Sequence, residues 1–210
     1  MKTYTVVKKS QESVPDEVFA GLEPQSIECC NWRGVYDYAP LVNFRMYHTG
    51  ECLHVRFDVE EEGTMARITD DNGEVWTDSC VELFLSPDCD DTYYNIETNC
   101  IGTQLIGWRR PGEVEHADAA TLALVRRESS LPRKTFAPES GTCRWSLTLA
   151  IPVEALFRHS IENLSGLTMR ANVYKCGDAM PRPHFLSWNP IEHPTPCFHL
   201  PAFFGELVFE

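Results

Sequence analysis

The sequence lacks the features that would direct it to a membrane or a nucleic acid. No apolar run approaches the ~20 residues that a membrane-spanning helix requires. Lys and Arg together number only 18 against 31 Asp and Glu, so the net charge is −13, and no basic run offers a surface for phosphates. We therefore expect neither nucleic acid nor an anionic membrane as a partner, whereas this charge does not repel a neutral sugar.

Cysteine is present, but the usual cysteine patterns are missing. The nine cysteines are an odd number, are scattered along the chain and include no CxxC pair, so neither a secreted disulfide framework nor a zinc ribbon is indicated. The opening segment "MKTYTVVKKSQESVP" also has no apolar stretch typical of a signal peptide. We expect mostly reduced thiols and a cytoplasmic location.

What the chain does have is alternation of apolar and polar residues, the mark of half-buried strands. The clearest cases are "CLHVRFDVE" (52–60), "CVELFLS" (80–86), "RWSLTLAI" (144–151) and "TMRANVYK" (168–175). Further strands are expected in "YTVVKK", "LVNFRMY", "YYNIETNCIGTQLIGW", "TLALVRR" and "GELVFE". The alternation predicts an inner core that contains Val81, Leu83, Leu85, Trp145, Leu147, Leu149, Met169, Ala171 and Val173.

Helical signals are sparse. Only "IPVEALFRHS" (151–160) predicts a helix, with Pro152 in its first turn. Many short strands with little helix favour an all-β fold, an antiparallel β-sandwich of jelly-roll or immunoglobulin type with one or two short helices. No linker or repeat interrupts the pattern, so we expect a single domain over 1–210.

Two of the five tryptophans stand beside polar, turn-forming residues. These are Trp76 in "EVWTDS" and Trp188 in "LSWNPIEHP", whereas Trp145 is in phase with core positions. An indole in a polar turn either closes the end of a sandwich or contacts a ligand. A sugar suits such a ring, because the flat C–H face of a pyranose stacks on it while the hydroxyls require polar partners.

Three of the expected strands each offer a polar face that could supply those partners. The residues are Glu82 in the first, Asn95, Glu97 and Asn99 in the second, and Arg170 and Asn172 in the third. These residues could equally belong to outer faces exposed to solvent, or Arg170 could form an ion pair with a glutamate on a neighbouring strand.

The order of these motifs resembles the family 9 carbohydrate-binding modules. The resemblance spans about residues 30–209 and rests on "WTDSCVELFLSP", "YYNIETNCIGT", "RWSLTLAIPVEAL" and the closing "FLSWNP…FHLPAFFGELVF". It implies a β-sandwich, a sugar held between two rings at the positions of Trp76 and Trp188, and a polar contact from Glu82. It also implies a mono- or oligosaccharide ligand, bound without chemical change, and a role beside glycoside hydrolases in carbohydrate catabolism.

The family can also bind structural calcium. Its candidate ligands here are the acidic turns "TDDNGE" and "SPDCDD", which contain Asp70, Asp71, Asp88, Asp90 and Asp91. No other cofactor is expected.

Three alternatives stay open. Glu82 and Glu97 could form the carboxylate pair of a glycoside hydrolase. Cys197 and His199 of "CFHLP", on one face of a strand, could contribute to a metal site, although two ligands are too few to close one. The sandwich could also serve a structural role only.

Overall fold

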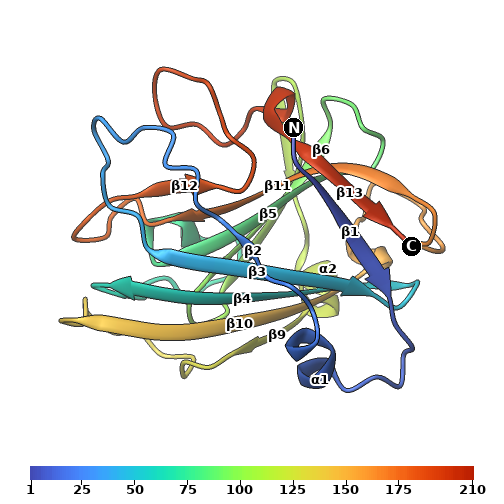
Figure 1. The fold of residues 1–210 in the computed structure, drawn as a ribbon, viewed down its shortest axis with the longest axis horizontal. Helices are drawn as coiled ribbons and strands as arrows, with labels where there is room; N and C mark the ends of the chain where they lie inside the picture. Colours follow the sequence, from blue (N-terminus) through green and yellow to red (C-terminus); the bar gives the residue numbers. More distant parts are fainter.

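The computed structural model describes residues 1–210 and confirms a β-sandwich (Figure 1). Its strands are β1 (Thr3–Lys8), β2 (Gln25–Ser26), β3 (Leu41–His48), β4 (Cys52–Glu62), β5 (Cys80–Ser86), β6 (Tyr93–Asn99), β7 (Gln104–Arg110), β8 (Glu113–His116), β9 (Arg126–Ser129), β10 (Thr142–Pro152), β11 (Thr168–Cys176), β12 (Phe185–Ser187) and β13 (Gly205–Phe209). The helices are α1 (Pro15–Ala20) and α2 (Ala119–Leu124), and three 3₁₀ turns are η1 (Val75–Thr77), η2 (Val153–Ala155) and η3 (Pro201–Phe203).

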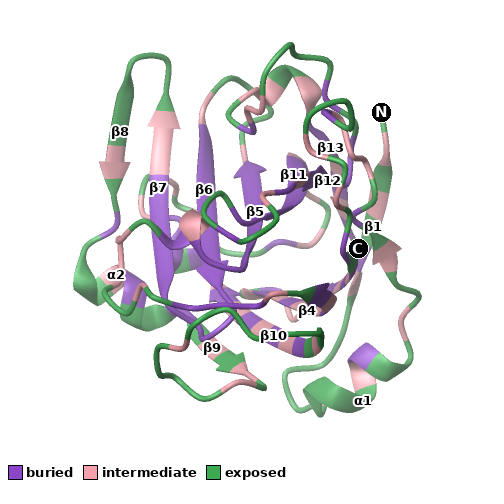
Figure 2. Cartoon of the chain, turned by 90° about the vertical axis from the view of Figure 1, so that its left-hand side faces the viewer, coloured by how far each residue is buried: buried purple, intermediate pink, exposed green.

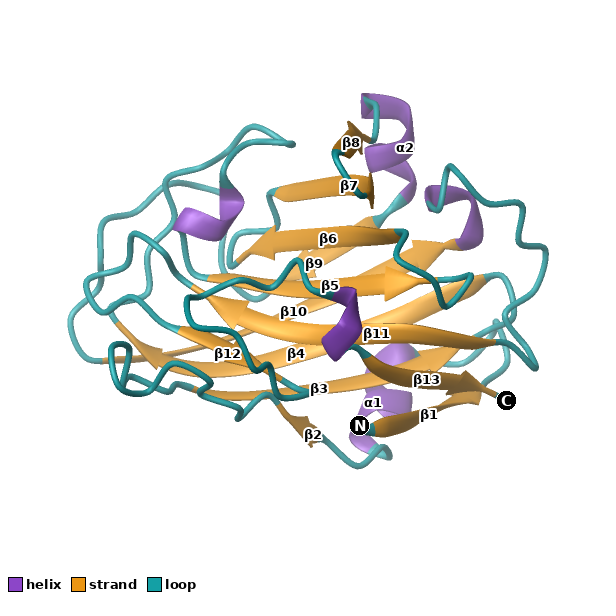
Figure 3. Cartoon of the chain, turned by 90° about the horizontal axis from the view of Figure 1, so that it is seen from above, coloured by secondary structure: helices purple, strands orange, loops and turns teal.

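The strands form two layers that β1 joins. The first sheet has the order β8-β7-β6-β5-β11-β13-β1, with β12 beside β11, and Figure 3 shows most of these strands side by side. The second sheet has the order β1-β3-β4-β10-β9, with β2 beside β3. The residues of β1 up to Val6 pair with β13, and Val7 and Lys8 pair with β3, in both cases in parallel. The other strand pairs are antiparallel, as expected, so β1 is the one strand that departs from this arrangement.

The space between the sheets holds the predicted core. All nine residues expected there are buried within one hydrophobic cluster: Val81, Leu83, Leu85, Trp145, Leu147, Leu149, Met169, Ala171 and Val173. The alternation located them because a one-residue slip would have placed Glu82 and Arg170 inside instead.

The helices lie elsewhere than predicted. Residues 151–160 do not form an α-helix, because β10 runs on to Pro152 and is followed only by η2. The segment "TLALVRR" is α2 followed by β9 rather than one strand. The backbone N–H of Thr121 donates to the Asp118 side chain, which caps the helix, and this acidic residue before "AATLAL" was a signal that the apolar alternation obscured.

The central strands of the first sheet are buried on both faces. Every residue of β5 and β6 is buried, and Figure 2 shows this in contrast to the partly exposed β7 and the exposed β8. On the outer face a second cluster, here called the outer cluster, packs loop residues such as Trp32, Ile191 and Phe198 against strand residues such as Phe84 and Tyr174. Polar residues on this face are therefore withdrawn from water, contrary to the alternative of solvated outer faces.

A buried ion pair joins the two sheets at one end of the core. Lys175 on β11 lies 2.8 Å from Glu61 on β4, and neither side chain is exposed. The Glu61 carboxylate also accepts from the Trp145 indole N–H at 2.7 Å. His184 accepts from Lys175 through Nε2 at 2.8 Å and donates through Nδ1 to the Arg182 carbonyl at 2.9 Å, so its ring is neutral. Burial and Lys175 lower the pKa of His184 to about 3.

We expect Lys175→Met to destabilise the fold by about 3–5 kcal/mol, because it leaves the Glu61 carboxylate buried without a cation. Arg144→Met is the matched control, since Arg144 pairs with neighbouring Glu60 at the surface and should cost less than about 1 kcal/mol. Urea denaturation of both variants measures the difference, and equal costs would show that the buried pair has no special weight.

We also expect His184 to make the fold sensitive to acid. Its pKa rises from about 3 in the folded state to about 6.5 on unfolding, so only the unfolded chain gains this proton as the pH falls below about 6.5. The free energy of unfolding that depends on neutral His184 is therefore fully present above about pH 6.5, and it decreases as the pH falls towards 3. Denaturation at pH 7.5 and at pH 4.5 should show a larger loss for the natural protein than for His184→Gln, and identical losses would contradict this assignment.

Candidate functional site

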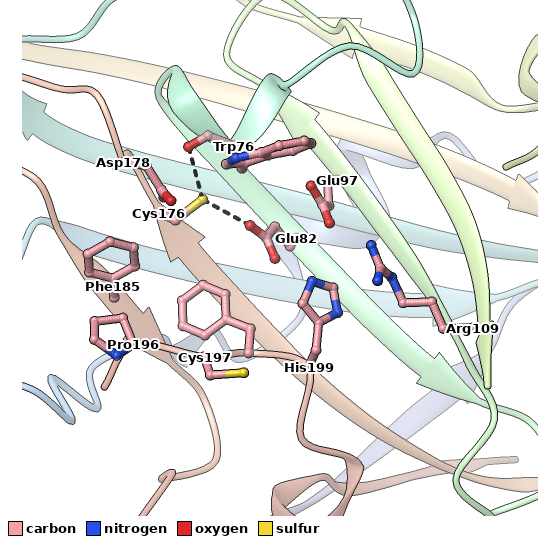
Figure 4. Close-up of a pocket in the computed structure, with 11 residues that line it drawn as sticks. Trp76, Glu82, Glu97, Arg109, Cys176, Asp178, Phe185, Pro196, Cys197 and His199 are labelled. Atoms are coloured by element: carbon pink, nitrogen blue, oxygen red, sulfur yellow. Dashed lines mark hydrogen bonds between the residues drawn. The ribbon is translucent and has the colours of Figure 1, made fainter. Parts of the chain in front are cut away.

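A cavity of about 260 Å³ opens on the outer face of the first sheet. Its floor comes from the strands, one wall from η1 with Trp76, and the opposite wall from the chain around Pro196 to His199 and from Phe185. Figure 4 shows the Trp76 indole on one side and His199 on the other, with Glu82 and Glu97 between them. The complete lining is Trp76, Glu82, Glu97, Arg109, Cys176, Asp178, Phe185, Pro196, Cys197, Phe198 and His199.

The two glutamates lie side by side on the floor. Glu82 on β5 and Glu97 on β6 are directly opposite each other in the antiparallel register, and each is 3% exposed. Burial raises the pKa of Glu82 well above its usual value, and nearby Cys176 and Glu97 add to the effect. Burial likewise raises the pKa of Glu97 to about 7, although a hydrogen bond from Asn95 opposes it. Glu97 can therefore present a carboxylic acid as well as a carboxylate to a ligand near neutral pH, and the raised pKa of Glu82 favours its protonated form.

A chain of hydrogen bonds orients Glu97. Asn95 donates through Nδ2 to Glu97 Oε1 at 2.7 Å, and Arg109 donates through Nε to Asn95 Oδ1 at 2.9 Å. Gly107 faces Asn95 across the strands, and a Cβ there would lie 2.6 Å from Asn95 Oδ1, so the absence of a side chain makes room for this amide. Glu97 Oε2 is buried and has no protein partner, and it is therefore available to a ligand hydroxyl.

The predicted pairing of Trp76 with Trp188 is wrong. Trp188 is 1% exposed, belongs to the core between the sheets, and packs edge-on against Phe44 at 5.8 Å. Its ring fits against Gly205, where a Cβ would lie 2.8 Å away. The residue directly follows β12 and is directed inwards, a choice of face that the polar neighbours in "SWNP" did not reveal. Trp76, by contrast, is half-buried and lines the cavity.

Three other predicted contact residues hold loops rather than line the cavity. Asn99 donates to the Ile68 carbonyl and to Asp78, and Asn172 bonds both backbone groups of Asn189. Arg170 donates to the Pro201 carbonyl. Of the predicted set, the cavity therefore brings together Trp76, Glu82 and Glu97, with Asn95 behind Glu97.

Several lining residues were not predicted from the sequence, notably Arg109, Asp178, Phe185, Pro196 and Phe198. Arg109 directly follows an expected strand that ended at Trp108, whereas β7 runs on to Arg110, and its two-residue spacing from Gly107 was a usable signal. Pro196 and Phe198 belong to a segment without helix or strand, whose path periodicity does not predict. Cys197 and His199 do not share a strand, but both reach the cavity, where His199 lies 3.1 Å from the Tyr93 hydroxyl.

In the acidic turns, some of the aspartate carboxylate oxygens already have hydrogen-bond partners within the protein. Asp71 accepts from the Gln104 backbone and from Arg127, Asp90 accepts from Thr92, and Asp88 contacts His159. Calcium binding in these turns stays a prediction. The nine cysteines are free thiols. The helices α1 and α2 have 6 residues each, and neither has the length of a membrane span.

The protein is a β-sandwich with a binding cavity that has aromatic side chains in its walls and two glutamates on its floor. The model of carbohydrate-binding family 9 matches residues 14–209, and the chain belongs to this family. None of the curated proteins matches it.

Solved structures agree with this assignment. A candidate carbohydrate-binding protein from Bacteroides uniformis is 43% identical over 100% of this chain and 99% of its own, with a TM-score of 0.96. Two family 9 module structures from Caldicellulosiruptor kristjanssonii share the fold at much lower identity. The complex with glucose is 13% identical, covers 100% of this chain and 96% of its own, and has a TM-score of 0.64. The complex with cellotriose is 14% identical, covers 100% of this chain and 94% of its own, and has a TM-score of 0.63.

The different positions of the two tryptophans predict different mutant phenotypes. Trp188→Ala should cost about 3–5 kcal/mol of stability, because it empties a large volume in the core. Trp76→Ala should change stability by less than about 1 kcal/mol, because its ring is partly exposed at a cavity wall. Thermal and urea denaturation measure the loss of stability in each variant. If Trp76→Ala is as unstable as Trp188→Ala, Trp76 belongs to the core.

Proposed function

We propose that the protein binds carbohydrate without transforming it, in the cavity between Trp76 and the segment Pro196–His199. The observation that carries the proposal is the combination of a partly exposed indole with Glu97 Oε2, a buried carboxyl oxygen without a partner. An indole takes the apolar face of a pyranose, and the oxygen takes a hydroxyl. The complexes of family 9 modules with glucose and cellotriose support this class of ligand.

The walls are suited to a ring held from two sides. Trp76 forms one wall, and Phe185, Pro196 and Phe198 contribute carbon to the other, in the place where the sequence predicted a second tryptophan. A cavity of about 260 Å³ suits one sugar ring better than a long chain segment. We infer that the ligand is a monosaccharide or the end unit of an oligosaccharide.

The polar groups on the floor supply directional contacts. Glu82 and Glu97 accept or donate hydrogen bonds according to their protonation, and Arg109 donates beside them. Arg109 uses only Nε towards Asn95, and its terminal nitrogens make no hydrogen bond or ion pair within the protein. Asp178 lies at the rim, where burial raises its pKa to about 6.

Glycoside hydrolysis is the second candidate, because Glu82 and Glu97 are a close carboxyl pair with raised pKa values. In hydrolases the two carboxyl groups flank the scissile bond. Here both rise from the same face of adjacent strands and would meet a sugar from the same side. This geometry favours binding over cleavage.

Calorimetry with glucose, cellobiose and cellotriose tests the proposal, together with a screen for hydrolysis of the same sugars. We expect binding without turnover. Trp76→Ala should weaken binding by about 30-fold, near 2 kcal/mol, because an aromatic contact at the centre of the site is lost. Arg144→Ala, which alters a surface pair away from this cavity, is the control and should bind normally.

Two results would contradict the proposal. One is a natural protein that binds none of a broad set of mono- and oligosaccharides. The other is hydrolysis that Glu82→Gln abolishes while Trp76→Ala retains it, which would favour the enzyme.

A further inference from the structure

Three metal-ligating side chains meet beneath the cavity. Cys80 on β5 and Cys176 on β11 are directly opposite in the antiparallel register, and Glu82 follows Cys80 by two residues on the same face. Their two sulfur atoms and a carboxylate oxygen lie within 4.8 Å of one another. Cys176 Sγ is 2.9 Å from Glu82 Oε1. Two paired strands thus fix these three side chains relative to one another.

The spacing suits a single ion. Atoms no more than 4.8 Å apart share a point within about 2.8 Å of all three, compared with about 2.3 Å for a zinc–sulfur bond and about 2.0–2.2 Å for a zinc–carboxylate bond. Shifts of the ligand atoms by about 0.5–0.8 Å, which small side-chain rotations produce, close that difference. Two sulfurs with one oxygen select a thiophilic ion such as Zn²⁺ over Ca²⁺ or Mg²⁺, which take oxygen ligands.

The cluster has an open side and lacks a counter-charge. Glu82 and Cys176 line the cavity and Cys80 lies fully buried beside them, so an ion would enter from the cavity side (Figure 4). Lys175, next to Cys176 in the chain, points to the opposite face and pairs with Glu61. None of the ion pairs in the structure involves Glu82, so no protein cation occupies the place that a metal would take.

We propose that Cys80, Cys176 and Glu82 bind one thiophilic divalent cation, with Zn²⁺ as the type, and leave its fourth position open to the cavity. This site is distinct in composition from the acidic turns considered for calcium. It does not depend on sugar binding, although it shares Glu82 with the cavity floor.

Titration of the reduced, metal-free protein with Co²⁺ tests the site directly. Thiolate coordination should produce a sulfur-to-cobalt charge-transfer band, and Zn²⁺ should displace the cobalt and remove the band. Cys176→Ser and Cys80→Ser should each weaken cobalt binding by about 100-fold or more, because each removes a ligand. Cys197→Ser is the matched control, since its thiol lines the same cavity outside the cluster, and it should bind cobalt normally.

The proposal fails if the natural protein gives no thiolate band, or if Cys197→Ser removes the band as fully as Cys176→Ser does. Circular dichroism shows whether each variant is folded. Should the cysteine variants unfold, Glu82→Gln keeps both thiols and should still weaken cobalt binding by about 10-fold or more; unchanged affinity would remove Glu82 from the site. Sugar calorimetry of the metal-free protein reports on the proposed function separately, because it includes no metal.

Discussion

The structure depends on one constraint, the burial of both faces of β5, β6 and the Ala171–Cys176 part of β11. A strand in a two-layer sandwich normally shows one face to water, and its polar residues are then solvated. Here the outer cluster covers that second face, with loop residues such as Phe198 packed on strand residues such as Phe84 and Tyr174. Glu82 and Glu97 consequently lie in a low-dielectric environment, which raises their pKa values and leaves a carboxyl oxygen without a protein partner. The cavity is the part of this face that the loops do not fill.

The two layers use ionisable groups in opposite ways. Between the sheets, Lys175 and Glu61 satisfy each other, and Trp145 and His184 complete their hydrogen bonds. On the outer face, Glu82 has a thiol rather than a cation as its neighbour. The paired charges between the sheets have no free valence for a ligand, whereas unpaired groups at the cavity, such as Glu97 Oε2, keep that capacity. The two roles meet in β11, where Lys175 and Cys176 are adjacent residues. Lys175 faces the core and pairs with Glu61, whereas Cys176 faces the cavity and contacts Glu82.

The inner half of the fold was predictable because period-two patterning decides which residues face the core. Val81, Leu83 and Leu85 followed from that rule alone, and Trp76 and Glu82, which the family motifs suggested as sugar contacts, both line the cavity. The rest could not be read in this way. Trp188 lies where a strand passes into a loop, and no periodicity fixes the face to which its ring turns. The opposite wall of the cavity comes from residues 196–199, which form neither helix nor strand, so their position depends on tertiary packing against the outer cluster. The sequence predicts Pro152 in the first turn of a helix, but it is the last residue of β10, because a proline can end a strand as well as begin a helix.

The pairing of β1 with β13 and β3 has a consequence for how the chain reaches this fold. Thr3 lies opposite Glu206 in the first sheet and Val7 lies opposite Tyr47 in the second, so β1 links the two sheets only once it has made a contact across nearly the whole chain. Loop-closure entropy makes such contacts slow to form. During synthesis the edge of β11 that awaits β13 stays unpaired until residue 209 has left the ribosome, and only then can the two layers be joined. The edge of β11 is therefore open from the synthesis of Cys176 until that of Phe209, and an unpaired strand edge of this kind is a site where other chains can pair before the fold is complete.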